Sequence, residues 1–157
     1  MARETLDLLF LVFNYGVLPF WALLILAPHW TPGPKLVAGV AVPALLGAVY
    51  VALLAMGAGA VFTGGAEGGI GGGGFDTLEG VMRLFTSPVA VLTGWVHYLA
   101  FDLFVGAWEV RDSRRRGVPH VLVAPCLVLT LMLGPTGLLA YVLLRGLSGR
   151  RSLGVAP

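Results

Sequence analysis

Charged residues are scarce in this sequence: aspartate, glutamate, lysine and arginine make up 11% of 157 residues, whereas 57% are hydrophobic. So little charge excludes an ordinary soluble domain, and the length allows about four membrane spans. The basic residues cluster at the ends of apolar runs instead of along one face, which argues against nucleic acid as a partner. Membrane lipid, through its headgroups, is the expected partner of these charges.

Cysteine and histidine are also scarce, with one Cys and three His. Cys126 has no partner for an internal disulfide, and its apolar setting argues against a nucleophile. No two histidines are spaced as H-x-x-H or H-x-x-x-H, which argues against a membrane di-iron hydroxylase or desaturase. A mononuclear metal site from His97, His120 and a carboxylate is a weaker alternative, and we expect no metal and no other cofactor.

The apolar runs predict an all-α polytopic membrane protein, with four transmembrane helices in one transmembrane domain over residues 1–157. The first run is too long for a signal peptide and no A-x-A site follows it. Residues 57–74 are dominated by glycine and predict a flexible loop, and residues 75–86 have the pattern of a short interfacial amphipathic helix with a capping-box-like start at Asp76 and Glu79. The four spans are expected at about residues 6–27, 36–56, 88–108 and 121–144.

Small residues and prolines suggest how these spans meet. Gly39, Pro43 and Gly47 recur every four residues in the second span and predict a face on which another helix docks. In the last span Pro135 removes an amide donor and predicts a bend, which is a candidate wall of a cavity. After Trp108, residues 109–116 are rich in charge and include three consecutive arginines at 114–116; this segment, which ends at Gly117, predicts a basic loop anchored to lipid headgroups.

The segment Thr93 to Asp112, which begins inside the third span, carries most of the polar side chains expected inside the membrane. His97, Asp102 and Glu109 lie within thirteen residues of one another, and an ionisable group at this depth marks a candidate functional site. On a helix Asp102 and Glu109 share a face, whereas His97 lies about 140° from Asp102. A simpler alternative is that an Asp in an aromatic helix only bonds to a neighbouring helix.

A carboxyl group desolvated in hydrocarbon can hold a proton near neutral pH, and a nearby imidazole can accept one. This predicts acid/base catalysis by His97, Asp102 and Glu109, with Asp102 as the main proton donor and Glu109 nearer the headgroups and water. An aromatic cleft beside them suits a long conjugated or isoprenoid ligand. The candidate ligand-binding residues are Asn14, Trp95, Tyr98, Phe101, Phe104, Trp108 and His120.

One long motif resembles a known family. The segments GWVHYLAFDLFVGAW and LTLMLGPTGLLAY, with Pro125, Cys126 and Leu127 before the second and FDTLEGVMRLFTSP before the first, are similar to the abscisic-acid-deficient-four-like membrane proteins, whose plant members are neoxanthin synthases. The resemblance covers Phe75 to Arg145 strongly and the first two spans by hydropathy. It implies conversion of violaxanthin to neoxanthin, an isomerisation in which an epoxide opens and an allene forms.

Two features depart from the plant proteins: the glycine run at residues 68–74, and the lack of a Ser/Arg-rich plastid transit segment. We therefore expect a bacterial cytoplasmic membrane rather than a plastid membrane, and a xanthophyll or related isoprenoid substrate rather than violaxanthin itself. A homo-oligomer is compatible with the sequence. The alternatives are a non-catalytic carotenoid-binding or photoprotective protein and a small carotenoid cyclase.

Overall fold

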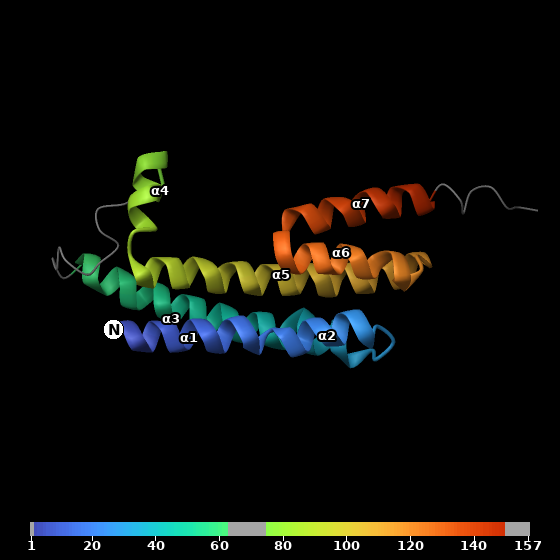
Figure 1. Ribbon diagram of the computed structural model, residues 1–157, viewed down its shortest axis with the longest axis horizontal. Coiled ribbons are helices and arrows are strands. Elements are labelled where there is room, and N and C mark those ends of the chain that lie inside the picture. The colour runs from blue at the N-terminus through green and yellow to red at the C-terminus, as the bar shows by residue number, and fades with distance from the viewer. Residues whose placement is uncertain (1, 63–74, 150–157) are drawn as a thin grey trace, which may run out of the picture. The chain divides into compact units, whose positions relative to one another are not determined.

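The computed structural model describes residues 2–62 and 75–149, and within these ranges every regular element is a helix (Figure 1). The predicted all-α class is confirmed. Three helices are long and apolar enough to cross a membrane: Arg3–Leu26, Gly33–Gly57 and Pro88–Arg116. The predicted count of four transmembrane helices is not confirmed, because the last apolar run is divided into two shorter helices.

Two compact units make up the chain. The first consists of Met1–Gly16 and Ala44–Leu99, and the second of Val17–Pro43 and Ala100–Pro157. The first unit holds α1 (Arg3–Gly16), most of α3 (Val42–Phe62), α4 (Leu78–Leu84) and the beginning of α5 (Pro88–Arg116). The second holds α2 (Leu18–Leu26), the π-helix η1 (Gly33–Ala41), the rest of α5, α6 (His120–Leu133) and α7 (Pro135–Gly149).

Helix α3 extends further than the sequence predicts. We expected a loop from Gly57, but the helix continues to Phe62, so this part of the loop prediction is wrong. Isolated glycines weaken a helix by only about 1 kcal/mol each, and the alanines between them are good helix formers. The remainder of the predicted loop, residues 63–74, lies outside the described residues.

The short helix expected within residues 75–86 is present as α4, with a different cap. The Thr77 hydroxyl accepts a hydrogen bond from the Gly80 amide at 3.0 Å, so Thr77 and not Asp76 begins the helix. Asp76 lies one residue too early to reach the first-turn amides. Leu78 and Met82 on the apolar face are exposed, and the location of α4 at the membrane surface stays a prediction.

Helix α5 starts at Pro88 as predicted but does not end near Trp108. It continues through the arginine triplet to Arg116 and stops at Gly117, whose φ of 68° allows the left-handed turn that commonly closes a helix. The prediction of a basic loop over residues 109–116 is therefore wrong. No glycine or proline interrupts this segment, so nothing local breaks the helix before Gly117.

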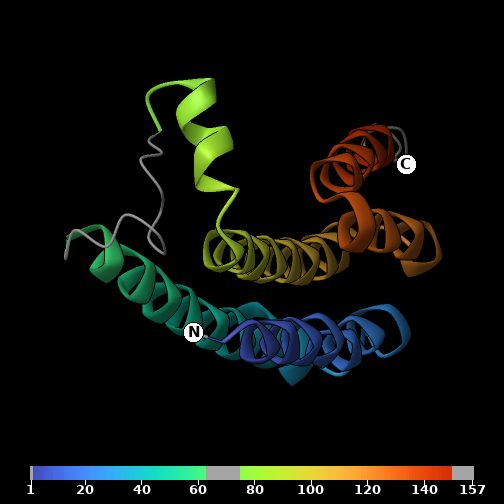
Figure 2. The ribbon, with the colours of Figure 1, turned by 60° about the vertical axis from the view of Figure 1, so that its left-hand side comes forward.

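The predicted last span, residues 121–144, is a helical hairpin instead of one bent helix. Gly134, with a φ of 43°, closes α6, and Pro135 begins α7, where its missing amide donor is harmless. Figures 1 and 2 show α6 and α7 side by side. A side chain at Gly137 would collide with the backbone of Thr130, so glycine at this position permits the close contact.

The small-residue stripe of the second span behaves differently at its two ends. A Cβ at Gly39 would overlap the Arg111 guanidinium and the Pro34 carbonyl, whereas a Cβ at Gly47 would meet nothing within 4 Å. Close approach is thus confirmed at Gly39, but at Gly47 the expectation of a docked helix within the described residues is wrong. Elsewhere in the second unit, Gly106 allows close packing between helices. A Cβ at Gly106 would be 2.7 Å from the ring of Trp21, a residue that is only 2% exposed.

Candidate functional site

The carboxyl group of Glu109 is the most deeply buried ionisable group on α5. Its residue exposure is 0%, and its Oε1 accepts a hydrogen bond from the Thr130 hydroxyl of α6 at 3.0 Å. The other oxygen, Oε2, is buried and has no hydrogen-bond partner within the described residues. Our expectation that water reaches Glu109 is therefore wrong, whereas its location near the headgroups stays a prediction.

Thr130 lies between two acceptors. Its Oγ1 is 3.0 Å from Glu109 Oε1 and 3.0 Å from the Cys126 carbonyl one turn earlier on α6. A hydroxyl has a single proton, so it donates fully to one acceptor at a time, while its lone pairs can accept from a second group. When Thr130 donates to Cys126, a protonated Glu109 can donate to Thr130, so the pair suits a carboxyl group that exchanges a proton.

Asp102 lies beside the turn of the α6–α7 hairpin. A Cβ at Gly134 would be only 2.8 Å from Asp102 Oδ1, and the Asp102 residue is half-buried. Asp102 and Glu109 are seven residues apart, about 10 Å along the axis of α5. The second unit thus brings both predicted carboxyl groups against the hairpin, one at its turn and one along α6.

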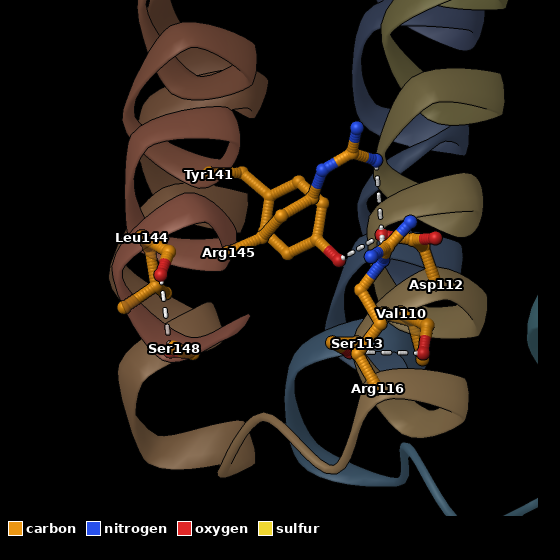
Figure 3. Close-up of polar contacts among 8 residues, drawn as sticks. All are labelled: Val110, Asp112, Ser113, Arg116, Tyr141, Leu144, Arg145 and Ser148. Carbon is orange, nitrogen blue, oxygen red and sulfur yellow. Dashed lines mark hydrogen bonds and ion pairs between the residues drawn. The ribbon is translucent and has the colours of Figure 1, made fainter. Parts of the chain in front are cut away.

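A second polar cluster ties the end of α7 to α5 (Figure 3). Asp112 Oδ2 accepts hydrogen bonds from the Tyr141 hydroxyl at 2.7 Å, the Arg116 guanidinium at 2.8 Å and the Arg145 guanidinium at 3.2 Å. Trp108 meets the Tyr141 ring edge-on at 5.4 Å, and Arg145 lies over the Trp108 ring at 5.6 Å. Sequence reasoning missed Asp112, Tyr141 and Arg145; an acidic residue two positions before a run of three arginines was the available signal.

His97 lies in the first unit, on the wall of an apolar cavity of about 270 Å³. Its ring is 5.5 Å from the Tyr50 ring of α3. Apolar side chains dominate the wall, among them Leu53 and Phe85, and Thr93 contributes a hydroxyl group. His97 and Asp102 belong to different units, so the structure does not test the predicted catalytic partnership between them.

The predicted ligand-binding residues have diverse surroundings. In the first unit, Trp95 donates to Asn14 Oδ1 at 3.3 Å and stacks on Tyr98 at 5.5 Å. In the second unit, Phe101 and Phe104 are 58% and 46% exposed, and His120 Nε2 is 2.9 Å from the Ile25 carbonyl. Their role in binding a ligand stays a prediction.

Within the described residues, no three His, Cys, Asp or Glu side chains are grouped as metal ligands. The mononuclear metal site considered in the sequence analysis would need both His97 and His120. These residues lie in different units, so that site stays a prediction.

Long apolar helices with carboxyl groups held against a hairpin define the class: an integral membrane protein with a polar interior site. A family model described as ABA DEFICIENT 4-like matches residues 8–141, and the chain belongs to this family. The resemblance found from the sequence motifs is thereby confirmed. Comparisons with characterised proteins and with solved structures give no significant match.

Proposed function

We propose that this protein is an acid/base isomerase of a xanthophyll or a related isoprenoid, acting within the membrane. The observation that carries the proposal is the complete burial of Glu109 against Thr130, on the same α5 face as Asp102. Ionisable groups enclosed within membrane-spanning helices are expensive to retain and are typically functional. Family membership supports the substrate class.

The proposed chemistry needs only proton transfers. An acid protonates an epoxide oxygen as the carbon–oxygen bond breaks, and a base removes a proton from the adjoining polyene, so that a hydroxyl group and an allene form in a product isomeric with the substrate. Asp102 is the proposed donor and His97 the proposed base. The Glu109–Thr130 pair is a proton reserve for the hairpin side of α5, because its carboxyl oxygen and hydroxyl are already in hydrogen-bond contact.

The second candidate is a carotenoid-binding protein without catalysis. The apolar cavity around His97 favours it, since that cavity can accept the end of a hydrophobic molecule and contains no carboxylate within the described residues. A binder retains pigment without changing it. An isomerase changes the ratio of two isomers of equal mass.

The test is chromatography of the carotenoids from a carotenoid-producing host with and without the chain, together with the pigment retained by the purified protein. Asp102→Asn preserves shape but cannot donate and regain a proton, and His97→Phe keeps an aromatic ring of similar girth that has no nitrogen to accept a proton. Each should reduce conversion by about 10²–10⁴-fold, the usual range for acid or base assistance. Glu109→Gln should also lower conversion.

The matched controls are Asp7→Asn and Glu79→Gln, which remove exposed carboxylates from α1 and α4. Both should convert carotenoid as the unaltered chain does. Undiminished conversion by a folded Asp102→Asn protein would contradict the catalytic role. Retained pigment with no new isomer from the unaltered chain would favour the binder.

A further inference from the structure

A basic cavity of about 290 Å³ lies in the second unit, distinct from the carboxyl site. Its lining residues are Thr31, Lys35, Arg111, Arg114 and Arg115. Four of these five carry a positive charge, and no carboxylate lines the cavity within the described residues. It is therefore a concentrated positive site built from two segments of the chain: the α2–η1 connection with the first turn of η1, and the end of α5.

Backbone carbonyl groups fix two of the arginines in place. Arg111 Nη1 donates to the Pro34 carbonyl, and Arg114 Nη1 donates to the Pro28 carbonyl at 3.1 Å. The absence of a side chain at Gly39 makes room for the Arg111 guanidinium. A guanidinium has five N–H donors, so one bond to a carbonyl orients the group and leaves donors for an anion.

Helix electrostatics account for only part of this cluster. Cations in the last turn of α5 are favoured by the negative end of the helix dipole, but Arg111 and Arg115 are one turn apart and repel each other. Lys35 lies in the first turn of η1, where the dipole disfavours a cation. A bound anion would offset both the repulsion and the unfavourable position of Lys35.

We propose that this cavity binds the phosphate group of an anionic membrane lipid. Its residues lie where candidate spans end: Thr31 and Lys35 flank the start of Gly33–Gly57, and the arginines close Pro88–Arg116. Trp30, which is 49% exposed, lies in the same connection, and tryptophan is enriched at the level of lipid headgroups. A soluble phosphate ion would be recognised by the same charged groups. Lipid headgroups, however, supply phosphate at the membrane surface, where these spans are expected to end.

The experiment uses the purified full chain in detergent at low salt. Dioctanoyl phosphatidylglycerol, dioctanoyl phosphatidylcholine and inorganic phosphate are titrated separately, and the melting temperature and dissociation constant are recorded. Phosphatidylglycerol should raise the melting temperature in a saturable manner, and added salt should weaken this effect. Equal stabilisation by phosphatidylcholine, or by inorganic phosphate, would overturn the assignment to an anionic lipid.

The variant that tests the site is Lys35→Gln with Arg115→Gln. Neither side chain makes a hydrogen bond or ion pair in the described part of the chain, so both can be replaced without breaking an internal contact. Each cation near an anionic surface contributes about fivefold in affinity, so the double variant should bind phosphatidylglycerol roughly 25-fold more weakly.

The matched control is Arg3→Gln with Arg83→Gln, which removes the same charge from exposed ion pairs on α1 and α4. It should bind phosphatidylglycerol as the unaltered chain does. Equal weakening in both double variants would show a general charge effect and overturn the site, as would unchanged binding after the Lys35 and Arg115 substitutions.

Discussion

The Thr130 hydroxyl lies 3.0 Å from the carboxyl group of Glu109, and this contact joins two helices through residues that are 21 positions apart in the chain. Neither residue has any exposure to solvent. In such surroundings a polar group without a partner is expensive, so Glu109 Oε1 depends on the Thr130 hydroxyl for its hydrogen bond.

Replacing Thr130 with valine keeps the shape of the side chain but removes the hydroxyl. Glu109 Oε1 then has no donor, and we expect the free energy of unfolding to fall by about 1–3 kcal/mol. Thermal unfolding in detergent measures the effect. Thr130→Ser, which keeps the hydroxyl but lacks the methyl group, should lose less, and an undiminished free energy of unfolding in Thr130→Val would show that the hydrogen bond does not stabilise the protein.

Tyr141→Phe tests the cluster that joins α7 to α5. It removes a 2.7 Å hydrogen bond to Asp112 while the ring stays edge-on to Trp108. A hydrogen bond to a charged group contributes about 1.5–3 kcal/mol, so the melting temperature should fall. In an Asp112→Asn background the same substitution should have a smaller effect, and additive losses would argue against direct coupling.

Gly137→Ala, Gly106→Ala and Gly47→Ala form a matched series within helices. A Cβ collides with the Thr130 backbone at Gly137 and with the Trp21 ring at Gly106, but has open space at Gly47. The first two should destabilise the protein, whereas Gly47→Ala should be neutral or stabilise it by up to about 1 kcal/mol through helix propensity. Melting temperatures in detergent measure the three effects. A lower melting temperature for Gly47→Ala would contradict the open space found at Gly47.

Labelling of single cysteines tests the membrane topology that the hairpin predicts. Arg145 reaches Asp112 at 3.2 Å, so α7 returns to the end of α5 from which α6 departs. In a Cys126→Ala background, Leu147→Cys and Arg114→Cys should therefore label from one side of the membrane and Glu79→Cys from the other. Labelling of Leu147→Cys with Glu79→Cys would instead restore four complete spans.

Local sequence was sufficient for the helical class and for the polar character of α5. In lipid, backbone groups must bond within their own segment, so long apolar runs imply helices whatever their neighbours are. The period of the helix likewise placed Asp102 and Glu109 on one face. Gly117 was expected to end the basic segment, and it does, but the conformation before it was helix and not loop.

The environment of each polar side chain could not be predicted from local sequence. Whether Pro135 bends a helix or begins a new one depends on Gly134 adopting a positive φ and on Gly137 meeting the backbone of Thr130. Sequence distance also misplaced Glu109: nearness to the arginines suggested water, but the returning hairpin covers it.

The sequence by itself determined that this protein is a helical membrane protein of the ABA DEFICIENT 4-like family, because hydropathy, helix period and a long motif are properties of contiguous residues. Only the tertiary structure decided which ionisable groups are enclosed and what they contact. Burial of Glu109 and the bonds to Asp112 come from α6 and α7, and a reversal of chain direction at Gly134 sets which residues of those helices reach α5.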